Sequence, residues 1–395
     1  MSPLAGLRRS LPVIVTFCVA ALAPTGLAAV ASPGSVRFVK GAGSSFDAYT
    51  TAPSRTQRAF MRAHYWRVRA YSPYFDSRLS WEPNAWAYQD AYAIYPSAPE
   101  ADRHPDWILR DGMGRKLWIQ YACSTGSCTQ YAADIGNPAF RAWWIAKARA
   151  KLAAGYKGIF IDDVNMAERV SIGDGASATP IDPRTGAPMG EAAWQHYMAA
   201  FMVQVRAALP GVEIVHNVLW PMGDRSQALR AELRAADYIE LERGFDDTGI
   251  VGGSGRFGFD TLLSFIDDRH AAGQGVILDG MATTPSARLY GLATYFLVSS
   301  GRDSLANDAA GAPNDWWPGY DVKLGRPLGG RYSSGGVWRR DFARGIVLVN
   351  GPDEPTRTVR VGPGYRDLAG TPRGSVTLPP SSGAVLVKIR RSRRA

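Results

Sequence analysis

The chain has 395 residues, of which 46% are hydrophobic, 20% charged and 11% aromatic. This balance excludes a mostly disordered chain and is typical of a globular protein with a large core. The 42 glycines and 26 prolines show no period, which excludes a collagen-like chain. The net charge of +10 is concentrated in part in the C-terminal run KIRRSRRA. No nucleic-acid-binding motif accompanies this run, so we interpret residues 391–395 as a solvated basic tail and expect no nucleic-acid partner.

Residues 1–31 have the pattern of a secretory signal peptide. A pair of arginines at positions 8 and 9 precedes an apolar run over 11–23, and the sequence AVA at 29–31 is a small-x-small cleavage site. The apolar run is too short to span a bilayer. We therefore expect cleavage near Ala31 and a secreted mature chain with no stable membrane insertion.

Two cysteines, Cys123 and Cys128, remain after removal of the signal peptide, which carries Cys18. In an oxidising compartment two cysteines this close are expected to form a disulfide, which stabilises the fold by roughly 2 kcal/mol. Zinc is the alternative ligand, but two thiols with no nearby histidine make only half of a zinc site. We expect no metal and no cofactor.

Short β-rich runs alternate with helical runs as far as about residue 305. Asn137 and Gly155 bracket one helix as N-cap and C-terminal stop. Eight strands alternating with helices predict a (β/α)₈ TIM barrel over residues 32–327, an α/β fold. The alternative is a doubly wound sheet, but no GxGxxG-type loop follows the first strand. The predicted strands are 37–41, 67–71, 88–94, 158–162, 212–217, 238–242, 275–279 and 303–305, and the clearest helices are 138–154, 191–209 and 260–272.

Two long segments and a C-terminal region depart from the alternation. Residues 95–136 are interpreted as a β-hairpin excursion, and residues 166–190 as a Gly-, Pro- and Ser-rich loop directly after the fourth strand. Long loops in this position often shape a substrate site. Six short β-rich runs over 328–390 predict a small antiparallel β-sandwich. Its aromatic residues are spaced like core residues, which favours a bracing role over carbohydrate binding.

Polar residues at the ends of four predicted strands are the strongest indication of an active site. The C-terminal ends of barrel strands face the active-site mouth, so these groups should converge there. A salt bridge or a helix N-cap would explain any one of them, but not the convergence of four. Paired carboxyls are the groups that cleave glycosidic bonds, one protonating the leaving oxygen and the other acting as nucleophile or base. The strand-end residues are Asp162 and Asp163, His216 and Asn217, Glu240 and Glu242, and Asp279.

The alternation of side chains along a strand selects the most favoured pair. Asp162 and Glu242 occupy the inward positions nearest the mouth, so we predict Asp162 as nucleophile or base and Glu242 as general acid. Asp163 with Glu240 is the alternative pair. Neither a GxSxG nor an HExxH motif is present, which argues against serine-hydrolase and zinc-protease chemistry. The predicted substrate-binding residues are Asn217, Asp279, and the loop tryptophans Trp316 and Trp317.

Several segments resemble a known family. HPDWILRDGMG, GYKGIFIDDVN, ADYIELERGF and WWPGYDVKLGRPLG resemble the glycosyl-hydrolase-like family 15 of bacterial proteins and, more distantly, the endo-α-1,4-polygalactosaminidase family (glycoside hydrolase family 114). The resemblance covers most of residues 37–390 and implies a TIM-barrel glycosidase. The catalytic pair that the second family implies falls on Asp162 and Glu242. Asn165 stands where that family tends to have a second Asp.

The residues and the resemblance together predict a secreted glycoside hydrolase that acts on a polysaccharide. We expect it to work as a monomer. The alternative is a non-catalytic carbohydrate-binding protein on a degenerate glycosidase barrel. The separation of the two acids distinguishes these functions, because about 5–10 Å would allow catalysis.

Overall fold

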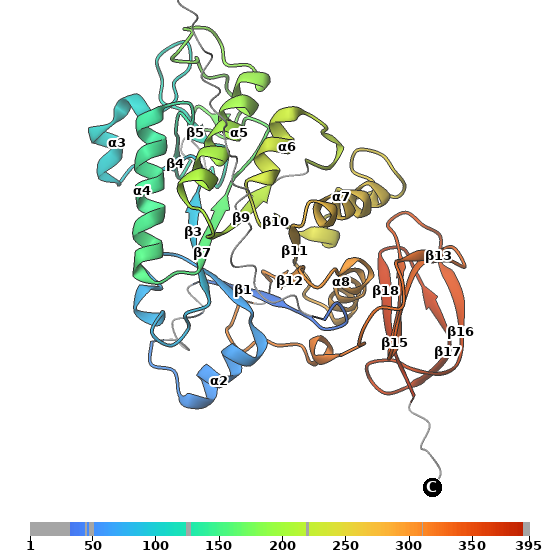
Figure 1. Ribbon diagram of the computed structural model, residues 1–395. Helices are drawn as coiled ribbons and strands as arrows, with labels where there is room; N and C mark the ends of the chain where they lie inside the picture. Colours follow the sequence, from blue (N-terminus) through green and yellow to red (C-terminus); the bar gives the residue numbers. More distant parts are fainter. Residues whose placement is uncertain are drawn as a thin grey trace, which may run out of the picture.

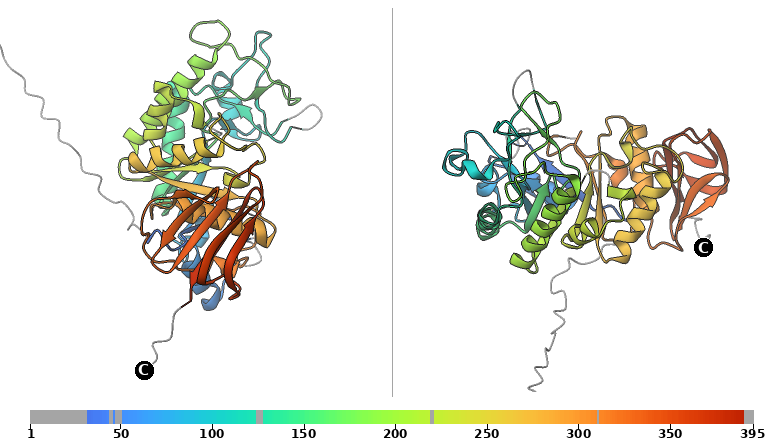
Figure 2. Two further views of the ribbon diagram at one scale, coloured as in Figure 1. Left: turned by 90° about the vertical axis from the view of Figure 1, so that its right-hand side faces the viewer. Right: turned by 90° about the horizontal axis from the view of Figure 1, so that it is seen from above.

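The computed structural model describes residues 32–43, 46, 51–123, 128–218, 221–309 and 311–389. A barrel and a smaller β-domain lie side by side, the second formed by the C-terminal part of the chain (Figures 1 and 2). The predicted signal peptide, residues 1–31, and the predicted basic tail, residues 391–395, lie outside the described residues. Within the described part of the chain, no helix is both long enough and apolar enough to cross a membrane.

The predicted (β/α)₈ barrel is confirmed. Eight parallel strands close in the order β1-β12-β11-β10-β9-β7-β3-β2, so that the first strand pairs with the last. The strands are β1 (Phe38–Ala42), β2 (Arg67–Ala70), β3 (Ala85–Asp90), β7 (Gly158–Asp162), β9 (Glu213–Val218), β10 (Tyr238–Leu241), β11 (Gly275–Gly280) and β12 (Ser304–Asn307).

Helices follow most barrel strands and cover the outside of the barrel. Between β2 and β3 the chain forms the short 3₁₀ turn η2 (Asp76–Arg78) in place of an α-helix. The predicted ends of one helix are confirmed, because the Asn137 side chain accepts the amide N–H groups of Ala139 and Phe140 and Gly155 ends the helix at φ 114°. The barrel helices are α2 (Arg55–His64), α4 (Pro138–Ala154), α5 (Glu191–Ala208), α6 (Gln227–Arg234), α7 (Phe259–Ala271) and α8 (Pro285–Val298).

The third strand lies earlier in the chain than the predicted 88–94. It spans Ala85–Asp90, and residues 93–94 belong to a different sheet. The Asp90 side chain accepts the amide N–H groups of Tyr92 and Ala93, both at 2.8 Å. This side-chain turn diverts the backbone out of the barrel, which the run of alternating residues in the sequence did not reveal.

The interior of the barrel contains two kinds of side chain. A central layer is apolar and includes Val39, Phe160, Val215, Ile277 and Ala306, all at most 4% exposed. Residues two positions further along the same strands point into the same lumen, nearer its mouth. The mouth end therefore receives polar side chains from several strands at once.

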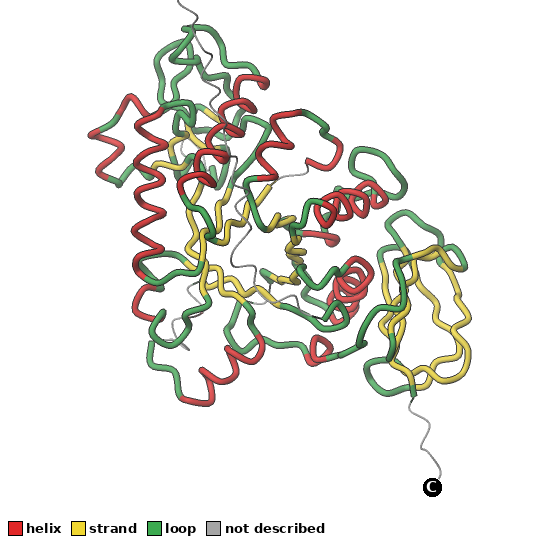
Figure 3. The backbone as a smooth tube through the Cα atoms, viewed as in Figure 1, coloured by secondary structure: helices red, strands yellow, loops and turns green. Residues whose placement is uncertain are grey.

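The two long insertions fold against each other. The hairpin predicted within 95–136 is present as β5 (Trp118–Ile119) and β6 (Tyr131–Ala132), preceded by α3 (Pro99–Arg103). These strands pair with β4 (Ala93–Ile94) and with β8 (Val170–Ser171), which comes from the second insertion. The predicted disulfide between Cys123 and Cys128 is formed in the first insertion. Figure 3 shows the loops of both insertions gathered beyond one end of the barrel strands.

The C-terminal domain is the predicted antiparallel β-sandwich. Its strands follow the order β13-β14-β15-β18-β16-β17 and fold around a small core that includes Ile346, Leu348 and Leu386. The opposite side of β15 and β18 packs on α8, as Figure 1 shows. The strands are β13 (Tyr332–Ser334), β14 (Val337–Phe342), β15 (Gly345–Asn350), β16 (Arg357–Arg366), β17 (Pro372–Leu378) and β18 (Ser382–Lys388).

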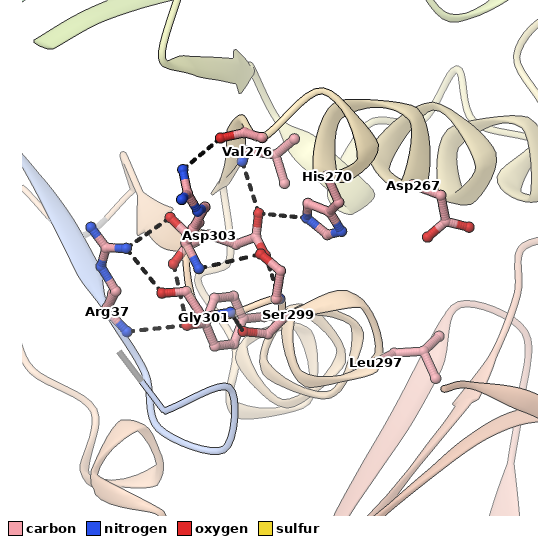
Figure 4. Close-up of polar contacts among 12 residues, drawn as sticks. Arg37, Asp267, His270, Val276, Leu297, Ser299, Gly301 and Asp303 are labelled. Carbon is pink, nitrogen blue, oxygen red and sulfur yellow. Dashed lines mark hydrogen bonds and ion pairs between the residues drawn. The ribbon is translucent and has the colours of Figure 1, made fainter. Parts of the chain in front are cut away.

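A buried carboxylate helps to close the barrel at the end opposite the mouth. One oxygen of Asp303 accepts hydrogen bonds from His270 Nε2 at 2.9 Å and from the amide of Val276 at 2.8 Å (Figure 4). Its other oxygen accepts the amide and hydroxyl of Ser300. Burial alone would raise the pKa of Asp303, but these hydrogen bonds and the His270 side chain lower it below its ordinary value. The ionised carboxylate thus joins α7, β11 and the segment that leads into β12.

Candidate active site

Three strands bring the two favoured carboxylates to the mouth. Asp162 is the last residue of β7, and Asn217 lies in β9, which pairs with β7. Glu242 is the first residue after β10, the next strand around the barrel. Asp162 is half-buried and Glu242 is exposed, so both carboxylates are open to a ligand that enters from the mouth.

Asn217 holds the two carboxylates together. Its side-chain nitrogen Nδ2 lies 2.8 Å from Asp162 Oδ1 and 3.3 Å from Glu242 Oε2. Because one nitrogen contacts both, these two carboxylate oxygens are no more than about 6 Å apart. This upper limit is compatible with catalysis by the two carboxyl groups.

Asp162 is further fixed by two other donors. Tyr88 donates its hydroxyl to Asp162 Oδ2 at 2.5 Å, and the backbone amide of Asp163 donates to Oδ1 at 2.8 Å. Burial, and then the charge of Asp162, raise the pKa of Tyr88, so this hydroxyl stays a donor. Tyr71 packs against Tyr88 with ring centroids 4.5 Å apart and planes tilted by 40°, and it is 48% exposed. An exposed aromatic ring therefore stands beside the Asp162 carboxylate.

Asp163 differs from Asp162 in its backbone conformation and in its hydrogen-bond partners. Its backbone adopts a left-handed conformation at φ 55°, and its side chain accepts a hydrogen bond from Asn165 Nδ2 at 2.9 Å. Burial, with the charge of Asp162 as the next cause, raises the pKa of Asp163 to about 6. Asp90 is nearby, and burial and the charges of Asp163 and Asp162 raise its pKa as well. Both aspartates therefore take up a proton at a higher pH than an ordinary aspartate does.

A cluster around Arg69 lies deeper in the same end of the barrel. Arg69 forms ion pairs with Glu240 and Asp308, and its Nη2 lies 3.9 Å from Asp279 Oδ2. Burial raises the pKa of Glu240 to about 8, although Arg69 acts in the opposite direction. Burial, and then the charge of Asp308, raise the pKa of Asp279 well above its ordinary value. One guanidinium does not balance three carboxylates in a low-dielectric site, so the cluster takes up protons.

Burial distinguishes Glu242 from Glu240. Glu240 is 0% exposed, whereas Glu242 is exposed to solvent. Asp162 and Asp163 are both half-buried, so burial does not distinguish them. Asp279 is 1% exposed and lies beside Arg69, and its role in substrate binding stays a prediction.

The two predicted loop tryptophans lie elsewhere. Phe38 neighbours the inward-facing Val39, so it points to the outside of the barrel, and Trp316 packs edge-on against it with ring centroids 5.4 Å apart. Trp317 packs on Tyr320, with centroids 5.1 Å apart. Both indoles therefore lie on the outer side of the barrel, away from the carboxylates, and their role in substrate binding stays a prediction.

The sequence prediction omitted several residues that the site contains. Arg69 lies in a predicted strand, and a charged residue between the apolar Val68 and Ala70 is a signal that could have identified it. Tyr88 could not have been assigned, because the predicted register of the third strand was wrong. Asp308 follows the last strand, in a segment with no distinctive motif.

A model of hypothetical glycosyl hydrolase family 15 matches residues 73–346, more than half of the chain. The chain belongs to this family. The match spans Asp162, Asn217 and Glu242, and it establishes the protein as a glycoside hydrolase family member. No curated protein matches the sequence. The more distant resemblance to the endo-α-1,4-polygalactosaminidase family stays a prediction.

Solved structures of glycosidases are similar to this chain to different degrees. The maltogenic α-amylase AmyB from Thermotoga neapolitana has a TM-score of 0.50 at 9% identity, over 90% of this chain and 99% of that chain. The glycoside hydrolase domain of PelA from Pseudomonas aeruginosa has a TM-score of 0.43 at 17% identity, over 69% and 95%. An α-amylase from Geobacillus thermoleovorans has a TM-score of 0.47 at 11% identity, over 92% and 100%. The likeness to AmyB concerns the fold alone.

Proposed function

We propose that this member of hypothetical glycosyl hydrolase family 15 is a secreted enzyme that cleaves a polysaccharide by double displacement. The observation that carries the proposal is the hydrogen bonding of Asn217 Nδ2 to both Asp162 and Glu242. It implies two carboxylates close enough for a covalent glycosyl-enzyme intermediate. A carbohydrate-binding protein would not require two carboxylates at this spacing.

Asp162 is the proposed nucleophile. Its carboxylate accepts hydrogen bonds from Tyr88, Asn217 and the amide of Asp163, which together fix its orientation. In the first step Asp162 attacks the anomeric carbon while the leaving oxygen takes a proton. In the second step water replaces Asp162 at the same carbon, and the configuration of the sugar is retained.

Glu242 is the proposed acid and base. It stands across Asn217 from Asp162 and is exposed to the mouth, where a leaving group and then a water molecule would arrive. It donates a proton to the leaving oxygen in the first step and accepts one from the water in the second. Tyr71, exposed beside Tyr88, is suited to stack on a sugar ring adjacent to the cleaved bond.

The proposed export has separate support. The pattern of residues 1–31 is that of a signal peptide, and a disulfide joins Cys123 and Cys128, as is common in exported proteins. Expression of the full chain, followed by N-terminal sequencing of the exported protein, should find a first residue at or near Ser32. Exported material that retains residues 1–31 would refute this part of the proposal.

A reducing-end assay on a panel of soluble polysaccharides tests the activity. The panel should contain neutral, uronic-acid and amino-sugar polymers. On a polymer that the wild type cleaves, Asp162→Asn and Glu242→Gln should each lower turnover at least about a hundredfold. Asp268→Asn, which changes a carboxyl on α7 paired with Arg225, is the matched control and should retain turnover.

Two results would contradict the proposal in different ways. Near-wild-type turnover in both Asp162→Asn and Glu242→Gln would refute the assignment of the pair. Inversion of the product anomer, measured by NMR immediately after cleavage, would refute double displacement. Binding without cleavage of every polymer would instead favour the non-catalytic function.

A further inference from the structure

A groove of about 1300 Å³ lies between the barrel and the β-sandwich. Its barrel side is formed by the start of α8 and by the 3₁₀ turn η6 (Pro318–Asp321) with the preceding Trp317. Its sandwich side is formed by β17, β18 and the turn between β16 and β17. None of the carboxylates of the candidate active site lines it. We call this space the interdomain groove.

Trp317 forms a fixed aromatic surface in the interdomain groove. A Cβ atom built on Gly319 would lie 2.4–2.5 Å from three atoms of the six-membered ring of Trp317, so only glycine allows this close approach. Tyr320 is perpendicular to the indole and supports it from a second direction. Trp317 is nevertheless only half-buried, and its remaining surface lines the groove.

Polar groups line the sandwich side of the same groove. On the sandwich side, Thr377 pairs its hydroxyl with that of Thr358 at 2.9 Å, and Arg373 donates to Asp367 Oδ2 at 2.9 Å. Ser375 lies on the same strand as Thr377 and is exposed. Hydroxyl, carboxylate and guanidinium groups can donate to and accept from the hydroxyls of a sugar, while a flat ring contacts its apolar C–H face.

We propose that the interdomain groove binds a stretch of polysaccharide at a site separate from the barrel mouth. A volume of about 1300 Å³ exceeds the ~300–1,000 Å³ of most small-molecule pockets, which favours an oligosaccharide over a single sugar. The groove would hold the polymer on the enzyme between cleavage events at the mouth. The inference rests on the proposed function in that it takes a polysaccharide as the ligand.

Binding measured without turnover separates this proposal from the catalytic one. The protein tested is the mature full chain carrying Asp162→Asn, so that no cleavage is expected. Its retardation is measured by native electrophoresis through gels that contain each soluble polysaccharide of the panel. Cleavage by the wild type, which tests the proposed function, is measured independently on the same panel.

Two variants in the Asp162→Asn chain test the groove. Trp317→Ala removes the aromatic surface, and Ser375→Trp fills the groove while leaving Trp317 on its glycine support. An aromatic contact contributes ~0.5–1.5 kcal/mol, so Trp317→Ala should weaken binding by about two- to tenfold. Ser375→Trp should weaken binding as well, because its side chain occupies the space of the ligand. Tyr332→Ala is the control, because it removes an exposed aromatic side chain from β13 and should not change binding.

Thermal denaturation shows whether each variant is folded, and Ser375→Trp keeps the test valid if Trp317→Ala is not. Weakened binding in a folded variant, with unchanged binding in Tyr332→Ala, would support the groove. Binding equal to that of the Asp162→Asn parent in both Trp317→Ala and Ser375→Trp would overturn it. Failure of the parent to bind any polymer would also overturn it, even if the wild type proves to be a hydrolase.

Discussion

Replacement of Glu240 by Gln should make the protein more stable at alkaline pH. The Glu240 side chain is 0% exposed and pairs with Arg69. Burial raises its pKa to about 8 from 4.5, against the effect of Arg69. A glutamine has nearly the same size and still offers Arg69 an acceptor oxygen, so the substitution mainly removes the ionisable group.

The expected effect follows from the difference between the folded and unfolded pKa values. Between about pH 4.5 and pH 8 the folded protein keeps a proton on Glu240 that the unfolded chain has lost. The free energy of unfolding therefore falls as pH rises through this range. A tenfold change in proton affinity is about 1.4 kcal/mol, so the whole difference corresponds to about 5 kcal/mol.

Urea denaturation at a series of pH values from 5 to 9 would measure this effect. Relative to the wild type, Glu240→Gln should gain about 1.4 kcal/mol of unfolding free energy for each pH unit up to about 8, and then level off. The substitution also removes one cause of the raised pKa of Asp279, because the charge of Glu240 contributes to it. Asp268→Asn, which removes an exposed carboxyl on α7 far from Glu240 in the sequence, is the control. Parallel curves for Glu240→Gln and the wild type would refute the reasoning.

Three further predictions concern other parts of the molecule. Asn217→Ala should lower turnover by about ten- to a hundredfold with little change in melting temperature, because both carboxylates lose the donor that aligns them. Unchanged turnover in the reducing-end assay would contradict this prediction. Asp303→Ala should lower the free energy of unfolding by about 3 kcal/mol, measured by urea denaturation, because the buried amide of Val276 and the partly buried amide of Ser300 would lose this acceptor. The mature, unreduced protein should show no free thiol when unfolded and titrated; two thiols per chain would exclude the Cys123–Cys128 bridge.

Most of the barrel could be predicted from local signals in the sequence. Asn137 and Gly155 bracket a helix with side-chain and backbone chemistry that acts within a few residues, and the structure has the same helix. The third strand was placed too late, because Asp90 ends it through a turn that the alternation of residue types does not reveal. The pairing of the two insertions through β5 and β8 also escaped prediction, since nothing local links segments about fifty residues apart.

For the candidate site, the sequence predicted only what the alternation of side chains along a strand can show. A period of two residues places Asp162 with Phe160 and Glu242 with Glu240, and so identifies which side chains face the lumen. It does not indicate depth within the barrel. The structure buries Glu240 against Arg69 and leaves Glu242 exposed, although both occupy inward positions.

The sequence by itself determined that this chain builds a strand–helix barrel whose strands end in acids, because periodicity, capping and turn chemistry act over short distances along the chain. The tertiary structure alone decided which of these polar side chains contact one another and how deeply each of them is buried. Asn217 touches two carboxylates from different strands, and Arg69 meets three acids from three further segments. Closure of the barrel brings these groups within hydrogen-bonding distance, and burial there shifts their pKa values.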